Sequence, residues 1–226
     1  PFSELPGSDF HKLNTLQEIC SSRELEIIVW INKWDSVNIH DTSKRTGILE
    51  RLDLMGKAFG GLWYDIGREA DLWLTHPQLT EELVSDGLWE IKMRLLQWGI
   101  PAERIMAGGK TVEGTLKIDR VVGPAWTTIT CYKMVDSAAA PLTGERMYAA
   151  ATLSLQQLRS QMIPGHRLIL IEIGWPTSDG LEKSTLIHRE CIRAARALSH
   201  GYGLWALPDF ENYAGDAQSR RYGIMQ

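Results

Sequence analysis

The sequence of 226 residues predicts an α/β fold, a TIM-barrel-like (β/α) barrel with six readable strands in a single catalytic-type domain over residues 1–226. Short apolar runs rich in β-branched residues recur along the chain, as in parallel strands that are buried on both faces. A segment with the apolar spacing of a helix precedes most of these runs. This alternation of helix and strand is typical of an α/β barrel.

The first part of the chain begins the alternation with a predicted helix at 13–23. A continuous β-branched run at 25–35 follows, and it has the composition of a buried parallel strand. A second helix is expected at 43–58 and precedes a strand at 61–69.

The middle of the chain contains a long helical pattern at 80–98. It starts at Thr80, a residue type that caps helix N-termini, and it ends at Gly99, a residue type that ends helices. A short strand is expected at 104–108, and the segment 126–133 is rich in residues that favour strands.

The last part of the chain repeats the pattern with helices at 146–162 and 184–199. A strand that ends at Glu172 lies between these helices, and a strand at 202–209 follows them. The total is six predicted strands.

Six strands are two fewer than a closed barrel of this type contains. Residues 1–7 read as the end of an earlier strand, so the first strand and most of the second are expected to be missing from the polypeptide. We therefore expect an incomplete or atypically closed barrel. The strand at 27–32 would have a free edge unless a partner or a second copy of the chain covers it.

Composition and charge exclude several classes of partner. The net charge is −4 and no basic stripe is present, which argues against binding to nucleic acid or to anionic membranes. No apolar run reaches the roughly 18 residues that a membrane span needs. The three cysteines and six histidines have no metal-ligand spacing, so we expect free buried thiols, no metal and no cofactor.

Two predicted strands end in a carboxylate. Glu172 closes the apolar run that begins at Arg167, and Glu69 closes the strand at 61–69. An unpaired carboxylate in apolar surroundings loses several kcal/mol of solvation, so it is found there mainly where chemistry, a partner or a metal uses it. Parallel strands end at one face of a barrel, and two acids at that face suggest glycoside hydrolysis. Both acids also have a purely structural interpretation. Glu172 could be a buried carboxylate paired with an arginine, and Glu69 could form a solvated ion pair with Arg68.

The segment Glu172-Ile-Gly-Trp-Pro-Thr resembles the motif at the end of strand seven in family 17 glycoside hydrolases, the β-1,3-glucanases and glucanosyltransferases. The run Asp65-Ile-Gly-Arg-Glu69 is similar to the strand-four motif of that family, and 205–224 is similar to its aromatic strand-eight segment. The resemblance implies a retaining hydrolase or transglycosylase that acts on β-linked glucan. It makes Glu172 the nucleophile and Glu69 the general acid/base.

Substrate contacts are expected from side chains near the strand ends. Aromatic rings stack on the apolar faces of pyranoses, although each of these rings would equally suit core packing. An oligo- or polysaccharide is therefore the expected partner. The candidate substrate-binding residues are Trp34, Asp65, Arg68, Tyr132, Trp175, Trp205 and Asp209.

Two other functions remain open. Arg68 stands where the wider barrel-hydrolase group has an Asn that holds the sugar 2-hydroxyl, which fits a weak or inactive relative that serves as a carbohydrate-binding or assembly module. A phosphate-binding barrel enzyme would use Lys133 and the run Gly108-Gly-Lys110, which has the composition of a phosphate-binding loop.

Overall fold

A computed structural model of the chain describes residues 15, 17–23, 27–30, 62–67, 69–75 and 79–204. The predicted helix at 43–58 lies outside these residues, as does most of the predicted strand at 25–35. The same holds for four of the candidate substrate-binding residues, which are Trp34, Arg68, Trp205 and Asp209.

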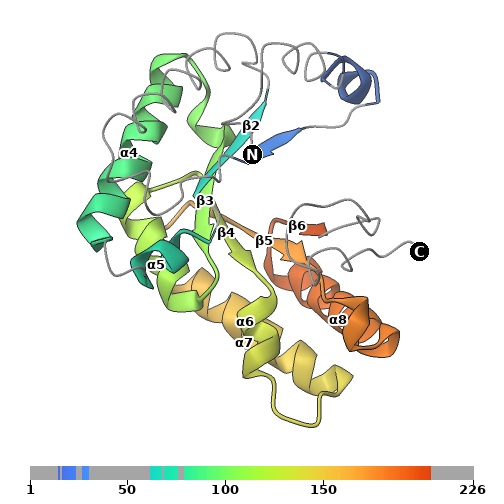
Figure 1. Ribbon diagram of the computed structural model, residues 1–226. Coiled ribbons are helices and arrows are strands. Elements are labelled where there is room, and N and C mark those ends of the chain that lie inside the picture. Colours follow the sequence, from blue (N-terminus) through green and yellow to red (C-terminus); the bar gives the residue numbers. More distant parts are fainter. Residues whose placement is uncertain are drawn as a thin grey trace.

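Six parallel strands form a single sheet whose spatial order is the order of the sequence. Figure 1 shows the sheet curving, with the helices on its convex side. Within the described residues, each terminal strand pairs on one side only. The α/β class and the six strands are confirmed. The strands are β1 (Ile28–Trp30), β2 (Trp63–Gly67), β3 (Ile105–Gly109), β4 (Trp126–Thr130), β5 (Arg167–Ile173) and β6 (Gly201–Leu204).

Three long helices agree with their predictions. They are α4 (Glu81–Gln97), α7 (Gly144–Gln161) and α8 (Leu181–Leu198). Helix α4 begins as expected, because the Thr80 side chain accepts a hydrogen bond from the amide of Leu83 at 3.2 Å. Short 3₁₀ turns lie between the larger elements at η2 (Ala70–Thr75), η3 (Ala102–Arg104) and η4 (Thr177–Asp179).

Two further helices were not expected from the sequence. Helix α5 (Val112–Val122) is rich in β-branched residues, which lower helix propensity, but it buries one face and ends at Gly123 with a φ of 55°. Helix α6 (Tyr132–Ser137) corrects the predicted strand at 126–133. The chain turns at Cys131, which has helical φ and ψ, so tertiary position overrides the strand propensity of the following residues.

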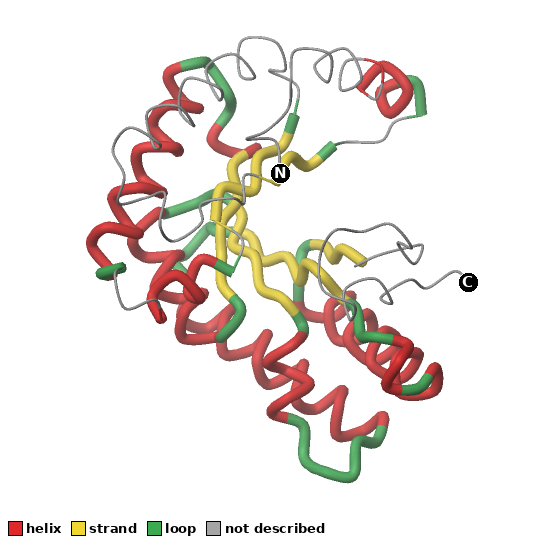
Figure 2. The backbone as a smooth tube through the Cα atoms, viewed as in Figure 1, coloured by secondary structure: helices red, strands yellow, loops and turns green. Residues whose placement is uncertain are grey.

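Alternate strand residues pack outward against the helices. Tyr64, Ile66 and Ile105 join α4 in one core cluster, and Leu168 and Leu170 join α7 and α8 in a second. Because side chains alternate along a strand, the residues between them face the concave side of the sheet. Figure 2 shows this arrangement, with the strands as an inner arc and the helices around it.

Candidate active site

The two predicted catalytic glutamates both lie at the carboxyl end of the sheet. Glu69 follows β2 by two residues, and Glu172 is the second-last residue of β5. Their φ angles are 51° and 55°, and they are the non-glycine residues with positive φ in the described part of the chain. This conformation costs roughly 1–3 kcal/mol, and such residues cluster at active sites.

The position of Glu172 is set by an irregularity in β5. The pairing of β5 with β6 shifts register between Leu170 and Ile173, and both of these residues pack in the outer core. In a regular strand, one residue would separate two side chains that face the same side, but here two residues lie between them. This extra residue is a β-bulge, and a bulge changes the direction in which a side chain such as Glu172 points. Glu172 is 6% exposed. The Cys131 thiol donates a hydrogen bond to the backbone carbonyl of Glu172 at 3.3 Å and to that of Gly174 at 3.5 Å.

The carboxylate of Glu69 reaches across the carboxyl ends of the strands to the last residue of β4. It is half-buried, and its Oε1 accepts a hydrogen bond from the Thr130 hydroxyl at 3.0 Å. Thr130 is paired in the β4–β5 ladder with Ile171, the residue immediately before Glu172. A carboxylate from the segment after β2 is thus hydrogen-bonded to the strand beside the one that carries Glu172.

Asp65 does not have the surroundings of a substrate contact. It faces the concave side of β2 but is 0% exposed, and its Oδ1 accepts from the amide of Gly67 at 3.4 Å. The register of β2 with β3 shifts between these two residues. A side chain with no exposed surface does not touch substrate in this conformation, so Asp65 shapes the end of β2.

The two described aromatic candidates are half-buried and lie next to cations. The Lys110 ammonium is 5.2 Å from the centre of the Tyr132 ring, and the Lys183 ammonium is 4.7 Å from that of Trp175. The indole N–H of Trp175 donates to Asp179 at 2.9 Å. The hydrogen bonds from Trp175 and Lys183 lower the pKa of Asp179. One face of Trp175 is therefore occupied by a lysine of the same chain.

The Gly108-Gly-Lys110 run does not form the phosphate cradle that its composition suggests. The amides of Lys110 and Thr111 both donate to the carboxylate of Asp71, at 2.7 and 2.9 Å. Donors already used by a carboxylate are not free for a phosphate. Lys133 pairs with Asp136 at 2.9 Å, in an exposed position. The structure thus removes the support for a phosphate-binding enzyme.

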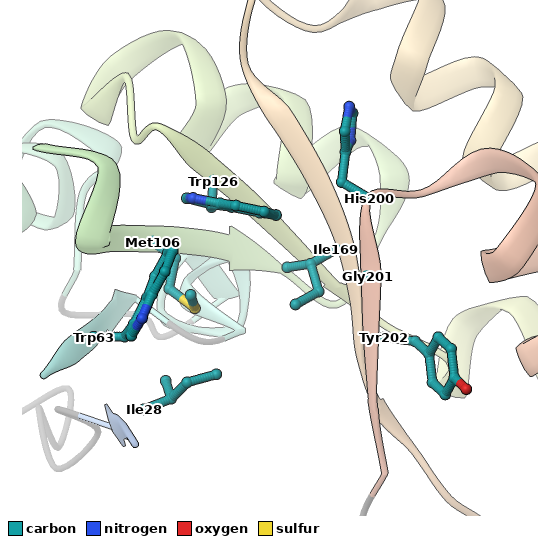
Figure 3. Close-up of a pocket in the computed structure, with 8 residues that line it drawn as sticks. All are labelled: Ile28, Trp63, Met106, Trp126, Ile169, His200, Gly201 and Tyr202. Carbon is teal, nitrogen blue, oxygen red and sulfur yellow. The ribbon is translucent and has the colours of Figure 1, made fainter. Parts of the chain in front are cut away.

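A pocket of about 220 Å³ occupies the concave face at the opposite end of the strands. Figure 3 shows Trp63, Met106 and Trp126 on one side of it and Ile169 on the other. The two indole rings meet edge to face with centroids 5.5 Å apart. These residues lie in the first half of their strands, so the pocket is separate from the edge that carries the glutamates.

Metal-binding clusters of three or more His, Cys, Asp or Glu residues are absent from the described ranges. Cys20, Cys131 and Cys191 are free, and the last two are buried as expected, whereas Cys20 is half-buried. A hydrogen bond to Cys131, followed by burial, raises the pKa of Cys191. Over the same ranges, no helix has the length and apolar character that a bilayer crossing requires.

Three residues of the site were missed in the sequence, namely Asp71, Thr130 and Cys131. Each acts through a contact between residues from 39 to 61 positions apart. The available signal was positional, because Thr130 and Cys131 end a strand and Asp71 follows Glu69 by two residues.

Comparisons with known proteins give one informative result. No family model matches the sequence, and no curated protein matches it. A solved structure titled endoglucanase is similar to this chain, with a TM-score of 0.63 and 10% sequence identity. The similarity covers 98% of this chain and 75% of the other. At this identity the comparison shows the fold alone, which is the α/β fold of a chain with a parallel, barrel-like sheet.

Proposed function

We propose that this chain is a retaining glycoside hydrolase or transglycosylase that acts on β-linked glucan. Glu172 is the nucleophile and Glu69 is the general acid/base. The observation that carries the proposal is the pairing of two positive-φ glutamates at one sheet edge, with Glu69 bonded to the strand next to Glu172. The endoglucanase with a similar fold supports the same reaction class.

The reaction needs two different carboxyl groups. Glu172 attacks the anomeric carbon as the protonated Glu69 gives its proton to the departing glycosidic oxygen, and a covalent glycosyl-enzyme forms. Glu69, now a carboxylate, takes a proton from water or from a sugar hydroxyl, which attacks the same carbon and releases Glu172. Retention requires carboxyl groups about 5 to 5.5 Å apart. We expect their carboxyl carbons within about 7 Å on one face.

Substrate contacts in this proposal come from the same edge. Tyr132 and Trp175, both half-buried, are proposed to provide ring surfaces for pyranoses. Trp34, Arg68, Trp205 and Asp209 complete the proposed set, on the family resemblance. The barrel is proposed to be one domain, with a partner or a second copy covering its open edge.

A weak or inactive relative that binds carbohydrate is the second candidate. Arg68 favours it, because Arg68 stands where the wider barrel-hydrolase group has an Asn that holds the sugar 2-hydroxyl, so this substrate contact would be lost. Under this reading Arg68→Asn raises activity from near zero. Under the first reading the parent protein is already active.

The test of the proposed function uses two variants and a matched control. Glu172→Gln should lower turnover by orders of magnitude on every substrate, because an amide does not attack an anomeric carbon. Glu69→Gln should lower kcat/KM far more on substrates with poor leaving groups than on activated aryl glycosides. Glu190→Gln is the control, since Glu190 is also a buried glutamate, 3% exposed, but lies on α8 in ion pairs with Arg189 and Arg193.

The assay follows reducing ends and transfer products from laminarin-type, mixed-linkage and mannan-type oligosaccharides. Proton NMR at early times identifies the anomer that is released, and retention gives the β-anomer first. Release of the α-anomer first, or full activity in both glutamine variants, would overturn the proposal. Circular dichroism confirms that each variant is folded.

A further inference from the structure

Asp71 lies in the turn that begins at Glu69. The amide of Leu72 donates to the carbonyl of Glu69 at 2.9 Å, which closes the first turn of η2 around Asp71. The backbone of Asp71 is thus two residues from the general acid/base and in the same hydrogen-bonded turn. A shift of Asp71 would therefore disturb the turn that carries Glu69.

The carboxylate of Asp71 is fixed by three short hydrogen bonds. It is 7% exposed and accepts from the amides of Lys110 and Thr111 at 2.7 and 2.9 Å and from the Thr111 hydroxyl at 2.7 Å. These donors precede α5, whose N-terminal end favours a negative charge. Hydrogen bonds to a carboxylate are about twice as strong as neutral ones.

The neighbouring backbone is shaped around this carboxylate. A Cβ at Gly114 would lie 2.2 Å from the Cβ of Asp71, and a Cβ at Gly109 would lie 3.0 Å from its Cγ. Glycine is needed at both positions so that the start of α5 can approach so closely. Asp71 therefore joins the segment after β2 firmly to the segment after β3.

We propose that Asp71 is a positioning residue for Glu69. Its three hydrogen bonds hold the turn that keeps Glu69 at a φ of 51° and its carboxyl beside Thr130. A glutamate with left-handed backbone angles persists only where surrounding contacts fix its conformation. At Glu69, the hydrogen bonds of Asp71 provide these contacts. The inference rests on the proposed role of Glu69 as the general acid/base.

Asp71→Asn tests the inference, with Asp119→Asn as the matched control. Asp119 is also a buried carboxylate with three contacts. It accepts from the Ile163 amide at 2.8 Å and from the Thr127 hydroxyl at 2.5 Å, and pairs with His166 at 2.7 Å. It lies at the other end of α5, away from the glutamates. Both variants lose a buried charge, and only one of them borders Glu69.

The readout is the dependence of the rate on the leaving group. Asp71→Asn should lower kcat/KM about 10- to 100-fold on unactivated laminarin-type oligosaccharides, because small misplacements of catalytic groups cost rates of this size. It should change kcat/KM on an activated aryl β-glucoside less than about threefold, since kcat/KM reports the first step and that leaving group needs no proton. Asp119→Asn should leave both rates near those of the parent at temperatures below its melting transition.

A second pair of variants covers the case in which Asp71→Asn does not fold. Thr111→Val removes the hydroxyl donor to Asp71 and the N-cap of α5, and Thr143→Val removes only the N-cap of α7. Thr111→Val should show the same leaving-group dependence, and Thr143→Val should show none. The inference is overturned if Asp71→Asn and Thr111→Val lose kcat/KM equally on both substrates, or lose none, while Glu69→Gln still shows its leaving-group dependence. If Glu69→Gln lacks that dependence, the proposed function itself fails.

Discussion

The backbone of Glu172 gives the sharpest test of how the proposed nucleophile is held. Cys131 is 0% exposed and its thiol donates to the carbonyls of Glu172 and Gly174 at 3.3 and 3.5 Å. The left-handed conformation of Glu172 costs about 1–3 kcal/mol, and the hydrogen bond from the thiol is one contact that offsets it. Cys131→Ala removes this contact, so the peptide of Glu172 can relax and its carboxylate can move.

Cys191→Ala is the matched control. Cys191 is also 0% exposed, packs in the same core cluster and hydrogen-bonds to Cys131, but no bond from it to a Glu172 or Gly174 carbonyl is found among the described residues. Each truncation removes one buried sulfur and should lower the free energy of unfolding by about 0.5–1.5 kcal/mol, similar to removing a buried methyl group. Cys131→Ala also loses its bonds to the two carbonyls, so it should melt at a somewhat lower temperature than Cys191→Ala in circular dichroism.

Activity should separate the two variants. Cys131→Ala should lower kcat/KM about tenfold or more on oligosaccharides and on activated aryl β-glucosides alike, because in the proposed mechanism every substrate needs the nucleophile. Cys131→Ser retains a donor at this position and should recover most of the loss. The reasoning is refuted if Cys131→Ala and Cys191→Ala have equal activity, or if the serine variant is as slow as the alanine variant.

Two further predictions concern stability. Burial raises the pKa of Tyr64 to about 12, so its contribution to the free energy of unfolding is fully present below pH 10 and is lost as pH rises through 12. The loss amounts to about 3 kcal/mol. In denaturant titrations, the free energy of unfolding of Tyr64→Phe should fall less steeply over that pH range than that of the parent. Gly108→Ala should destabilise the fold by about 3 kcal/mol or more, because the added Cβ would lie 1.7 Å from the Thr128 carbonyl oxygen. Gly201→Ala should cost less than about 1 kcal/mol, because its Cβ would meet no atom closer than 3.5 Å. A comparison of the two melting temperatures checks this.

Local patterns in the sequence were sufficient for most of the described fold. The helix that starts at Thr80 has its cap and its apolar face in consecutive residues, so it was predictable. Helix α5 was not, because its Val, Ile and Gly residues disfavour a helix and its stability comes from burial against the sheet. Tyr132 has the composition of a strand residue but follows the turn at Cys131, which only the tertiary structure sets.

The candidate site divides in the same way. The place of Glu69 and Glu172 at the carboxyl ends of their strands could be predicted, because a carboxylate at the end of an apolar strand is visible in the sequence. The residues that hold them act across strands, and no spacing in the sequence reveals the bonds from Thr130 or Cys131. The use of the Lys110 and Thr111 amides was not readable from the Gly108-Gly-Lys110 pattern either, because they bind a carboxylate 39 and 40 residues away.

Trapping of the covalent intermediate tests the central claim most directly. An activated 2-deoxy-2-fluoro-β-glucoside slows both steps of a retaining reaction, but its good leaving group lets the first step proceed, so the glycosyl-enzyme accumulates. Intact mass spectrometry should show the addition of one fluoroglucosyl group, and peptide mapping should place it on Glu172, with no adduct in Glu172→Gln. An adduct on another residue, or hydrolysis of natural glucan by the parent with no adduct at all, would contradict the assignment of Glu172 as the nucleophile.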